Sequence, residues 1–331
     1  MRLTVGTYDT EAWHLSLDDE LNVVGAEAVP VSNASYMCTQ ADGGYIYTIT
    51  ESGEESYITS FPAKGPFTPV SRVKCAAPDP CYIVYRKGFL YTADYSGGSV
   101  SVYPAADGRV GPLFCRVCFE GNGPHTRKQK ASHIHMLKIH GELMYAADLG
   151  SDRVRILRIL PDGSLEHLED LVLPSGSGPR HLDVSADGRF VYVLTEMGKD
   201  LAVFDLDRDT RTPVQLLKLG DPSLESQNGG DIHLHPNGLF LYVSLRDGDD
   251  SIISFYIKPQ SGTLTRKQSV SVAGHPRNFV ILPDKGLVAV FCKNVDRIQF
   301  YPLDSRTGII GSLQKEIILS PSSNPVYGLF Q

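Results

Sequence analysis

The sequence lacks the features that membrane, secreted and nucleic-acid-binding proteins need. No apolar run approaches the roughly 18 residues of a membrane-spanning helix. Met1–Tyr8 lacks the apolar core of a signal peptide and leads directly into a strand-like pattern. The formal net charge is −7, whereas nucleic-acid binding favours a basic surface. These absences predict a cytoplasmic protein with no membrane or nucleic-acid partner, as a monomer or weak homo-oligomer.

Cysteine is scarce, and familiar cofactor motifs are missing. Six cysteines are present, and only Cys115 and Cys118 form a C-x-x-C pair. A zinc or redox role would need a second pair or a strand-to-helix setting, and neither is visible. We therefore expect reduced structural cysteines, because cytosolic thiols stay reduced. A G-x-S-x-G elbow, a P-loop and a dinucleotide fingerprint are also missing, so no cofactor is predicted.

The sequence is instead rich in short runs of Val, Ile, Tyr and Phe separated by Gly, Asp and Asn turns, and it has no convincing amphipathic helix. A strand start recurs about every 48 residues, as expected for four strands per repeat. Seven such repeats predict an all-β, seven-bladed β-propeller with four antiparallel strands per blade, forming a single domain over residues 1–331. The third residue of each repeat, here called the slot, is Ser35, Cys81, His133, Arg180, Asp231, Arg277 and Val326.

The two ends of the chain predict how the ring closes. The last slot, Val326, opens a first strand with nothing after it, and Leu3–Tyr8 reads as a second strand with no first strand before it. We expect these two segments to share one blade, which leaves no free edge at the seam.

Chemically versatile side chains gather at one predicted mouth of the propeller. The first strand of a blade lines the central channel, and the second runs antiparallel to it, so the start of the first and the end of the second meet. Residues two positions beyond the slots share their strand face and add His135 and His233. The second-strand ends are Glu51, Asp94, Asp148, Glu196 and Arg246.

This mouth predicts an anion-binding site. Arginines bind a carboxylate or phosphate in bidentate fashion, and a Glu or His can move protons near neutral pH. His133 and His135 with His233 and an acid could also hold a divalent metal. Three arginines at the same mouth would repel a cation, so no metal is predicted.

These segments carry a family likeness. Gly178–His181, Asp231–His233 with Tyr242–Arg246, Pro276–Phe279 and Arg127–Gln129 before Ser132–His135 resemble the seven-bladed β-propeller lactonase family. That family includes propeller-type 6-phosphogluconolactonases and fungal carboxymuconate cyclases. The resemblance implies catalytic roles for His133, Glu196, Arg180 and Arg277. We expect substrate contacts from His135, His181, Asp231, His233, Arg246 and Asp148.

The leading hypothesis is a metal-independent hydrolase that opens a small anionic sugar lactone, 6-phosphogluconolactone first among them. Arg180 and Arg277 would hold the anion and the developing oxyanion. Either His133 or Glu196 would be the general base, and the other would protonate the leaving ring oxygen. A cycloisomerase that closes a lactone on an unsaturated dicarboxylate is the second reading. A non-catalytic binding propeller is the third, and the single tryptophan, Trp13, weakens it.

Overall fold

The computed structural model describes residues 1–40, 42–220, 223–224 and 227–331. It contains two compact units: unit 1 comprises Met1–Glu169 with Val326–Gln331, and unit 2 comprises Asp170–Pro325. Regular structure in the described ranges is almost entirely strand, with three short 3-10 helices, η1 (Gly53–Glu55), η2 (Pro283–Lys285) and η3 (Lys293–Val295). Across those ranges, no helix has the length and apolar character needed to cross a membrane.

The strands of unit 1 form four antiparallel sheets, in which β16 extends a few residues past the unit boundary. The sheet that contains both chain ends is β30 (Pro325–Phe330), β1 (Arg2–Thr7), β2 (Ala12–Leu17) and β3 (Val23–Val29). The next is β4 (Ala34–Thr39), β5 (Tyr45–Thr50), β6 (Tyr57–Pro62) and β7 (Ser71–Lys74). The third is β8 (Pro80–Arg86), β9 (Phe89–Asp94), β10 (Ser99–Ala106) and β12 (Cys115–Cys118), with the short β11 (Arg109–Val110) also on β10. The fourth is β13 (Ile134–His140), β14 (Leu143–Asp148), β15 (Arg153–Ile159) and β16 (Leu165–Val172).

Unit 2 repeats the same sheet three times. Its first sheet is β17 (Pro179–Val184), β18 (Phe190–Thr195), β19 (Asp200–Asp205) and β20 (Gln215–Lys218). The second is β21 (Asn228–Leu234), β22 (Phe240–Arg246), β23 (Ser251–Ile257) and β24 (Leu264–Ser271). The third is β25 (Pro276–Leu282), β26 (Leu287–Cys292), β27 (Arg297–Asp304) and β29 (Lys315–Ile318), with β28 (Ile309–Ile310) also on β27.

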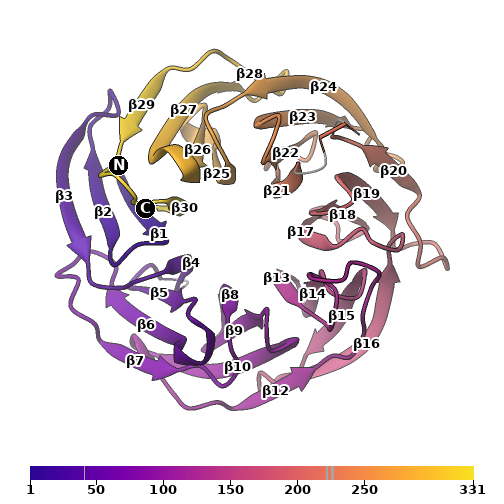
Figure 1. The fold of residues 1–331 in the computed structure, drawn as a ribbon, viewed down its shortest axis with the longest axis horizontal. Coiled ribbons are helices and arrows are strands. Elements are labelled where there is room, and N and C mark those ends of the chain that lie inside the picture. Colours follow the sequence, from indigo (N-terminus) through magenta and orange to yellow (C-terminus); the bar gives the residue numbers. More distant parts are fainter. Residues whose placement is uncertain (41, 221–222, 225–226) are drawn as a thin grey trace. The chain divides into compact units, whose positions relative to one another are not determined.

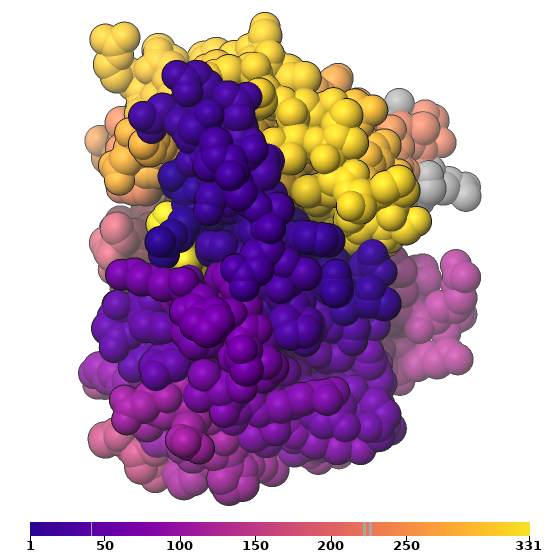
Figure 2. Space-filling model, turned by 90° about the vertical axis from the view of Figure 1, so that its left-hand side faces the viewer, coloured from indigo at the N-terminus to yellow at the C-terminus, as the bar shows by residue number. Residues whose placement is uncertain are grey.

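Within each unit the first strands of successive sheets lie next to one another. In Figure 1, β4, β8 and β13 lie side by side along one margin of unit 1. Within unit 2, β17, β21 and β25 likewise lie side by side along one margin. Strands such as β18 and β22 are buried on both faces, whereas the fourth strands β7 and β20 alternate between half-buried and exposed residues. The outer strand β3 is largely exposed. In Figure 2 the N-terminal residues of unit 1, which include β3, are coloured indigo and face the viewer. The second strands are therefore more deeply buried than the outer fourth strands.

The turns follow the residue types that the sequence supplies. Lys87-Gly88 and Asp107-Gly108 join consecutive strands with positive φ at both central residues, the geometry of type I′ hairpin turns. Other turn glycines pack against aromatic rings at the start of a neighbouring second strand. A Cβ on Gly262 would lie 2.3 Å from the ring of Phe190, and one on Gly308 would lie 2.4 Å from the ring of Phe240. Glycine is therefore required there by close packing as well as by φ.

The structure confirms the predicted sheet plan. The described residues form seven antiparallel sheets of four principal strands, and β30 pairs with β1 as the closure of one blade requires. Backbone hydrogen bonds between Arg2 and Gln331 join these strands in both directions. The description of residues 1–331 as one domain stays a prediction.

Candidate active site

The slots coincide with β-bulges in the first strands. In unit 2 the pairing register shifts between Pro179 and His181, between Gly229 and Ile232, and between Pro276 and Asn278. One or two residues at each shift have no partner on the second strand, and they include Arg180, Asp231 and Arg277. A bulge re-aims its extra side chain. These three slots of the sequence repeat therefore share one structural feature, the bulge of the first strand.

The slot of the β13 sheet differs from the prediction. Its register shift lies between Ile134 and Met136, so the bulged residue is His135 rather than His133. His133 lies before the strand, and its carbonyl accepts the Leu149 N–H at 2.9 Å. The two histidines are two residues apart, with His133 just before β13 and His135 at its bulge. The spacing between successive repeats varies by several residues, so the sequence could not show which of the two histidines occupies the slot.

The predicted set of second-strand ends is also wrong by one residue at two positions. Asp94 pairs with Pro80, and Asp148 pairs with Ile134. In the β17 sheet the equivalent residue is Thr195, which pairs with Pro179. Glu196 is therefore one residue further along than the two aspartates. Because a shift of one residue reverses the strand face, Asp94 and Asp148 point into their own blades and are fully buried.

Asp94 makes an unusual contribution to stability. Its carboxylate accepts hydrogen bonds from Thr92, Ser99 and Ser101, but burial dominates and raises its pKa to about 6. A raised carboxyl pKa favours folding at low pH, and this advantage is lost as pH rises through the folded value. We expect wild type to gain about 2 kcal/mol relative to Asp94→Asn between pH 7 and pH 4. Urea unfolding of both proteins across this range measures the gain, and a constant difference would contradict it.

Glu196 is the centre of the charged cluster in unit 2. Its Oε2 accepts a hydrogen bond from Nη2 of Arg246 at 2.7 Å and lies 3.2 Å from Nε of Arg180. All three side chains are at most 8% exposed. A carboxylate between two guanidinium groups is stabilised as the ion. Glu196 is therefore placed to hold two arginines more readily than to exchange a proton.

Each arginine of this cluster is also fixed to backbone. Arg180 donates from Nη1 to the Gly230 carbonyl at 2.5 Å, and Arg246 donates from Nε to the Gly229 carbonyl at 3.1 Å. Burial, with repulsion from Arg246 and Arg277, lowers the pKa of Arg180 to about 9, so it stays charged at neutral pH. Arg277, in contrast, is only half-buried. The cluster thus concentrates positive charge that an anionic ligand would neutralise.

Asp231 joins three polar side chains from three first strands. Its Oδ1 accepts from His181 Nδ1 at 2.6 Å, and its Oδ2 accepts from His233 Nε2 at 2.9 Å and from Asn278 Nδ2 at 2.6 Å. Burial opposes its ionisation, but electrostatic attraction to His233 and the hydrogen bonds from both imidazoles hold the pKa of Asp231 well below its usual value. Burial and Arg180 lower the pKa of His181 to about 4, which keeps this imidazole neutral. The side chain of His181 is 6% exposed and that of His233 is 32% exposed, so His233 is the more accessible of the two.

His133 has the surroundings of a general base within unit 1. Its Nδ1 lies 2.8 Å from the Tyr95 carbonyl, and its ring stacks on the Tyr95 ring at 4.5 Å between centroids. A carbonyl only accepts, so Nδ1 carries the proton and the lone pair of the neutral ring is on Nε2. Asp148 accepts the His133 backbone N–H at 2.9 Å and also binds Ser132 and Arg155. Asp148 therefore fixes the segment that carries His133.

The remaining predicted residue, His135, is buried, with its ring edge-on to Tyr95 at 5.7 Å. Sequence reasoning missed several partners of the site, namely Tyr95, Gly229, Gly230, Asp247, His275 and Asn278. Gly230 and Asn278 each adjoin a slot, and Asp247 adjoins the strand end Arg246, so the repeat pattern brought them near the predicted mouth without showing their contacts. Within the described part of the chain, no group of three or more His, Cys, Asp or Glu side chains has an arrangement suited to a metal ion.

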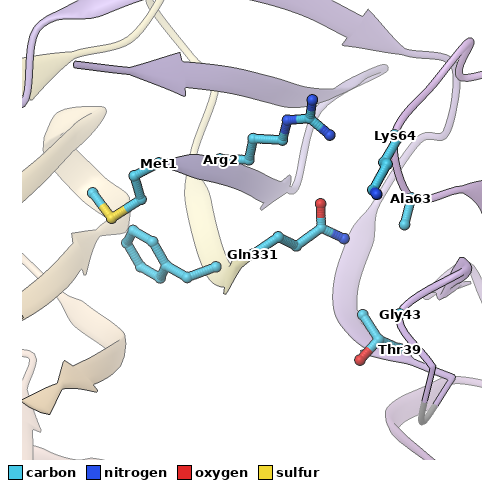
Figure 3. Close-up of a pocket in the computed structure, with 8 residues that line it drawn as sticks. Met1, Arg2, Thr39, Gly43, Ala63, Lys64 and Gln331 are labelled. Atoms are coloured by element: carbon cyan, nitrogen blue, oxygen red, sulfur yellow. The ribbon is translucent and has the colours of Figure 1, made fainter. Parts of the chain in front are cut away.

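A cavity in unit 1 is lined by none of the predicted site residues. It has a volume of about 590 Å³ and is lined by Arg2 and Lys64 together with Met1, Thr39, Gly43, Ala63, Phe330 and Gln331. Figure 3 shows the polar ends of Arg2, Lys64 and Gln331 directed toward the same space. Thr39 ends β4, whereas the slot residue Ser35 lies near the start of that strand. The cavity is therefore at the opposite end of the blade from the slots.

Comparisons with known proteins establish the family. Residues 2–326 match the family model described as lactonase, 7-bladed beta-propeller. The chain therefore belongs to the seven-bladed β-propeller lactonase family, which confirms the fold class and the resemblance seen in the sequence.

Relatives across this family align over most of their length. The 6-phosphogluconolactonase of Bacillus subtilis is 27% identical over 322 residues, which cover 92% of this chain and 91% of that protein. The 6-phosphogluconolactonase of Formosa agariphila is 26% identical over 315 residues, which cover 90% of this chain and 89% of that protein. Among solved structures, the periplasmic gluconolactonase of Pseudomonas aeruginosa superposes with a TM-score of 0.87 at 26% identity, covering 99% of this chain and 98% of that chain.

Proposed function

We propose that this protein hydrolyses a small anionic sugar lactone, and that 6-phosphogluconolactone is its substrate. The observation that carries the proposal is the buried pair of Arg180 and Arg246 on the carboxylate of Glu196, with Arg277 near enough to Arg180 to lower its pKa. Such a cluster suits a phosphate or carboxylate and the oxyanion of an acyl-transfer intermediate. Family membership and the names of the two bacterial relatives support the same reaction.

In the proposed reaction, His133 acts on the same lactone as the arginine cluster. Nε2 of His133 removes a proton from water, and the water oxygen attacks the lactone carbonyl carbon. Arg180 and Arg277 stabilise the negative charge on the carbonyl oxygen. The bond from the carbonyl carbon to the ring oxygen then breaks, and the His133 imidazolium returns its proton to that oxygen.

The remaining roles follow from the contacts within each unit. Glu196 holds Arg180 and Arg246, and Asp231 orients His181 and His233. His233 and His135 are proposed to contact the sugar. Asp148, which sequence reasoning placed against substrate, is assigned to fixing His133. The proposal needs no metal or cofactor, because a water, an imidazole and an oxyanion site suffice for ester hydrolysis.

The experiment that tests this function is hydrolysis of freshly generated δ-6-phosphogluconolactone, with non-phosphorylated gluconolactone as the comparison substrate. Arg277→Ala is expected to lower kcat/KM for the phosphorylated lactone by about 10²-fold or more. The loss on gluconolactone should be smaller if Arg277 binds the phosphate. Arg297→Ala, which removes an arginine paired with Glu316 on the outer part of the same blade, should change neither rate. Turnover no faster than the spontaneous reaction would reject the proposal.

We also infer a cytoplasmic location and a role in carbohydrate metabolism, in the pentose phosphate pathway. All six cysteines are free thiols, which suits a reducing compartment. Fractionation that placed the protein in an oxidising compartment would reject this location. The proposed partner is the lactone alone, with the protein a monomer or weak homo-oligomer.

A further inference from the structure

We propose that His275 and Asp247 are positioning residues that hold Arg246, and through it Glu196, in the working geometry of the site. The inference rests on the proposed lactonase function. His275 directly precedes β25, and Asp247 directly follows β22. Both residues have positive φ, 61° for His275 and 66° for Asp247, a backbone conformation that is uncommon for residues other than glycine.

The contacts form a directed chain. Nε2 of His275 lies 3.0 Å from Nη1 of Arg246, and Nδ1 of His275 lies 2.7 Å from Oδ1 of Asp247. A guanidinium only donates, so Nε2 must accept and carry the lone pair. Nδ1 therefore carries the proton and donates it to the Asp247 carboxylate. The charge of Asp247 thus decides that Nδ1 of His275, and not Nε2, carries the proton.

The surrounding groups support this protonation state. The charged groups that face His275 are Asp247, Arg246 and Lys293, and Asp250 accepts its backbone N–H at 3.0 Å. Burial, assisted by Arg246, lowers the pKa of His275, so the imidazole is neutral near pH 7. Burial opposes ionisation of Asp247, but the hydrogen bond from His275 and the charge of Arg246 hold its pKa below the usual range.

Loss of the Asp247 charge should reverse the histidine tautomer. Oδ2 of Asp247 accepts a hydrogen bond from Nδ2 of Asn228 at 3.1 Å, so in Asp247→Asn the amide oxygen is expected to keep this place. The amide NH2 then faces Nδ1 of His275 and donates to it, which leaves the histidine proton on Nε2. Two donors, Nε2–H and Nη1–H, would then face each other, and the guanidinium of Arg246 would have to move. Arg246 is 2.7 Å from Glu196, so Glu196 and Arg180 would shift with it. A displacement of about 1 Å in a site of this kind costs about 10²-fold in rate.

The experiment combines kinetics with nitrogen-15 NMR of the histidine rings in the full-length protein. Asp247→Asn is expected to lower kcat/KM for δ-6-phosphogluconolactone between about 10-fold and 10²-fold, and to move the His275 proton from Nδ1 to Nε2. His275→Gln keeps an acceptor oxygen for Arg246 and has no tautomer, so it should stay within about threefold of wild type. The double variant Asp247→Asn/His275→Gln should recover to the level of His275→Gln. Asp284→Asn, an exposed aspartate on η2, is the matched control and should match wild type.

Rescue separates positioning from a general loss of stability, because a merely destabilised double variant would be no better than Asp247→Asn. The proposal is overturned if Asp247→Asn keeps wild-type turnover, or if the double variant does not recover. Absence of turnover in wild type would instead reject the proposed function. In that case an unchanged His275 tautomer in Asp247→Asn would overturn the chain of contacts as well, and a reversed tautomer would support it.

Discussion

Replacing Glu196 by glutamine is expected to reduce lactone hydrolysis by about 10²-fold or more and to lower the free energy of unfolding by about 3–5 kcal/mol. Glu196 provides the negative charge between Arg180 and Arg246, and all three side chains are buried. An amide at this position would leave two guanidinium groups facing each other without a counter-charge. Removing one partner of a buried ion pair costs more than the pair itself contributes, because the remaining charges are left uncompensated.

The control for this variant is the same substitution in an exposed ion pair. Glu166→Gln breaks the contact with Arg158 at 3.0 Å, where both side chains are about half exposed. Such pairs contribute less than about 1 kcal/mol, so stability and turnover should stay close to wild type. Urea unfolding and kcat/KM are measured on both variants below the unfolding transition. A Glu196→Gln protein as stable and as active as Glu166→Gln would refute the central role of this carboxylate.

Replacing His133 by asparagine is expected to reduce kcat by about 10²-fold to 10⁴-fold with little change in stability. The asparagine amide can still donate to the Tyr95 carbonyl, as Nδ1 of His133 does at 2.8 Å. It has no atom at the place of Nε2, so the proposed base is lost while the local hydrogen bond is kept. Because His133 is only half-buried, the change should cost less than about 1 kcal/mol in unfolding free energy.

His140→Asn at the other end of β13 is the matched control and should retain wild-type kcat. Steady-state kinetics with thermal unfolding of both variants gives the two readouts. If His133→Asn kept its turnover and only KM rose, His133 would be a binding residue, and the base would have to be sought elsewhere. His135, at the bulge of the same strand, would be the next residue to replace.

The two corrections to the site have one physical origin. Periodicity reports which segments are equivalent, but the bulges and turns that fix pairing register are not visible in it. The His-x-His spacing concealed whether His133 or His135 occupied the slot. A one-residue difference placed Asp94 and Asp148 inside their blades while Glu196 joined the arginines. Hydrophobic alternation is unaffected by such shifts at a strand end, so the blades themselves were predicted correctly.

The sequence by itself determined the seven repeats, the pairing of the terminal strands and the arginine-rich slots, because strand alternation and turn residues are local properties. Only the tertiary structure decided that Glu196 holds Arg180 and Arg246, that Asp231 joins His181 and His233, and that Asp247 and His275 hold Arg246 in turn. Most of these partners come from different blades, up to 50 residues apart in the chain. Their hydrogen bonds depend on distances of a few tenths of an ångström, which strand packing sets and residue order does not encode.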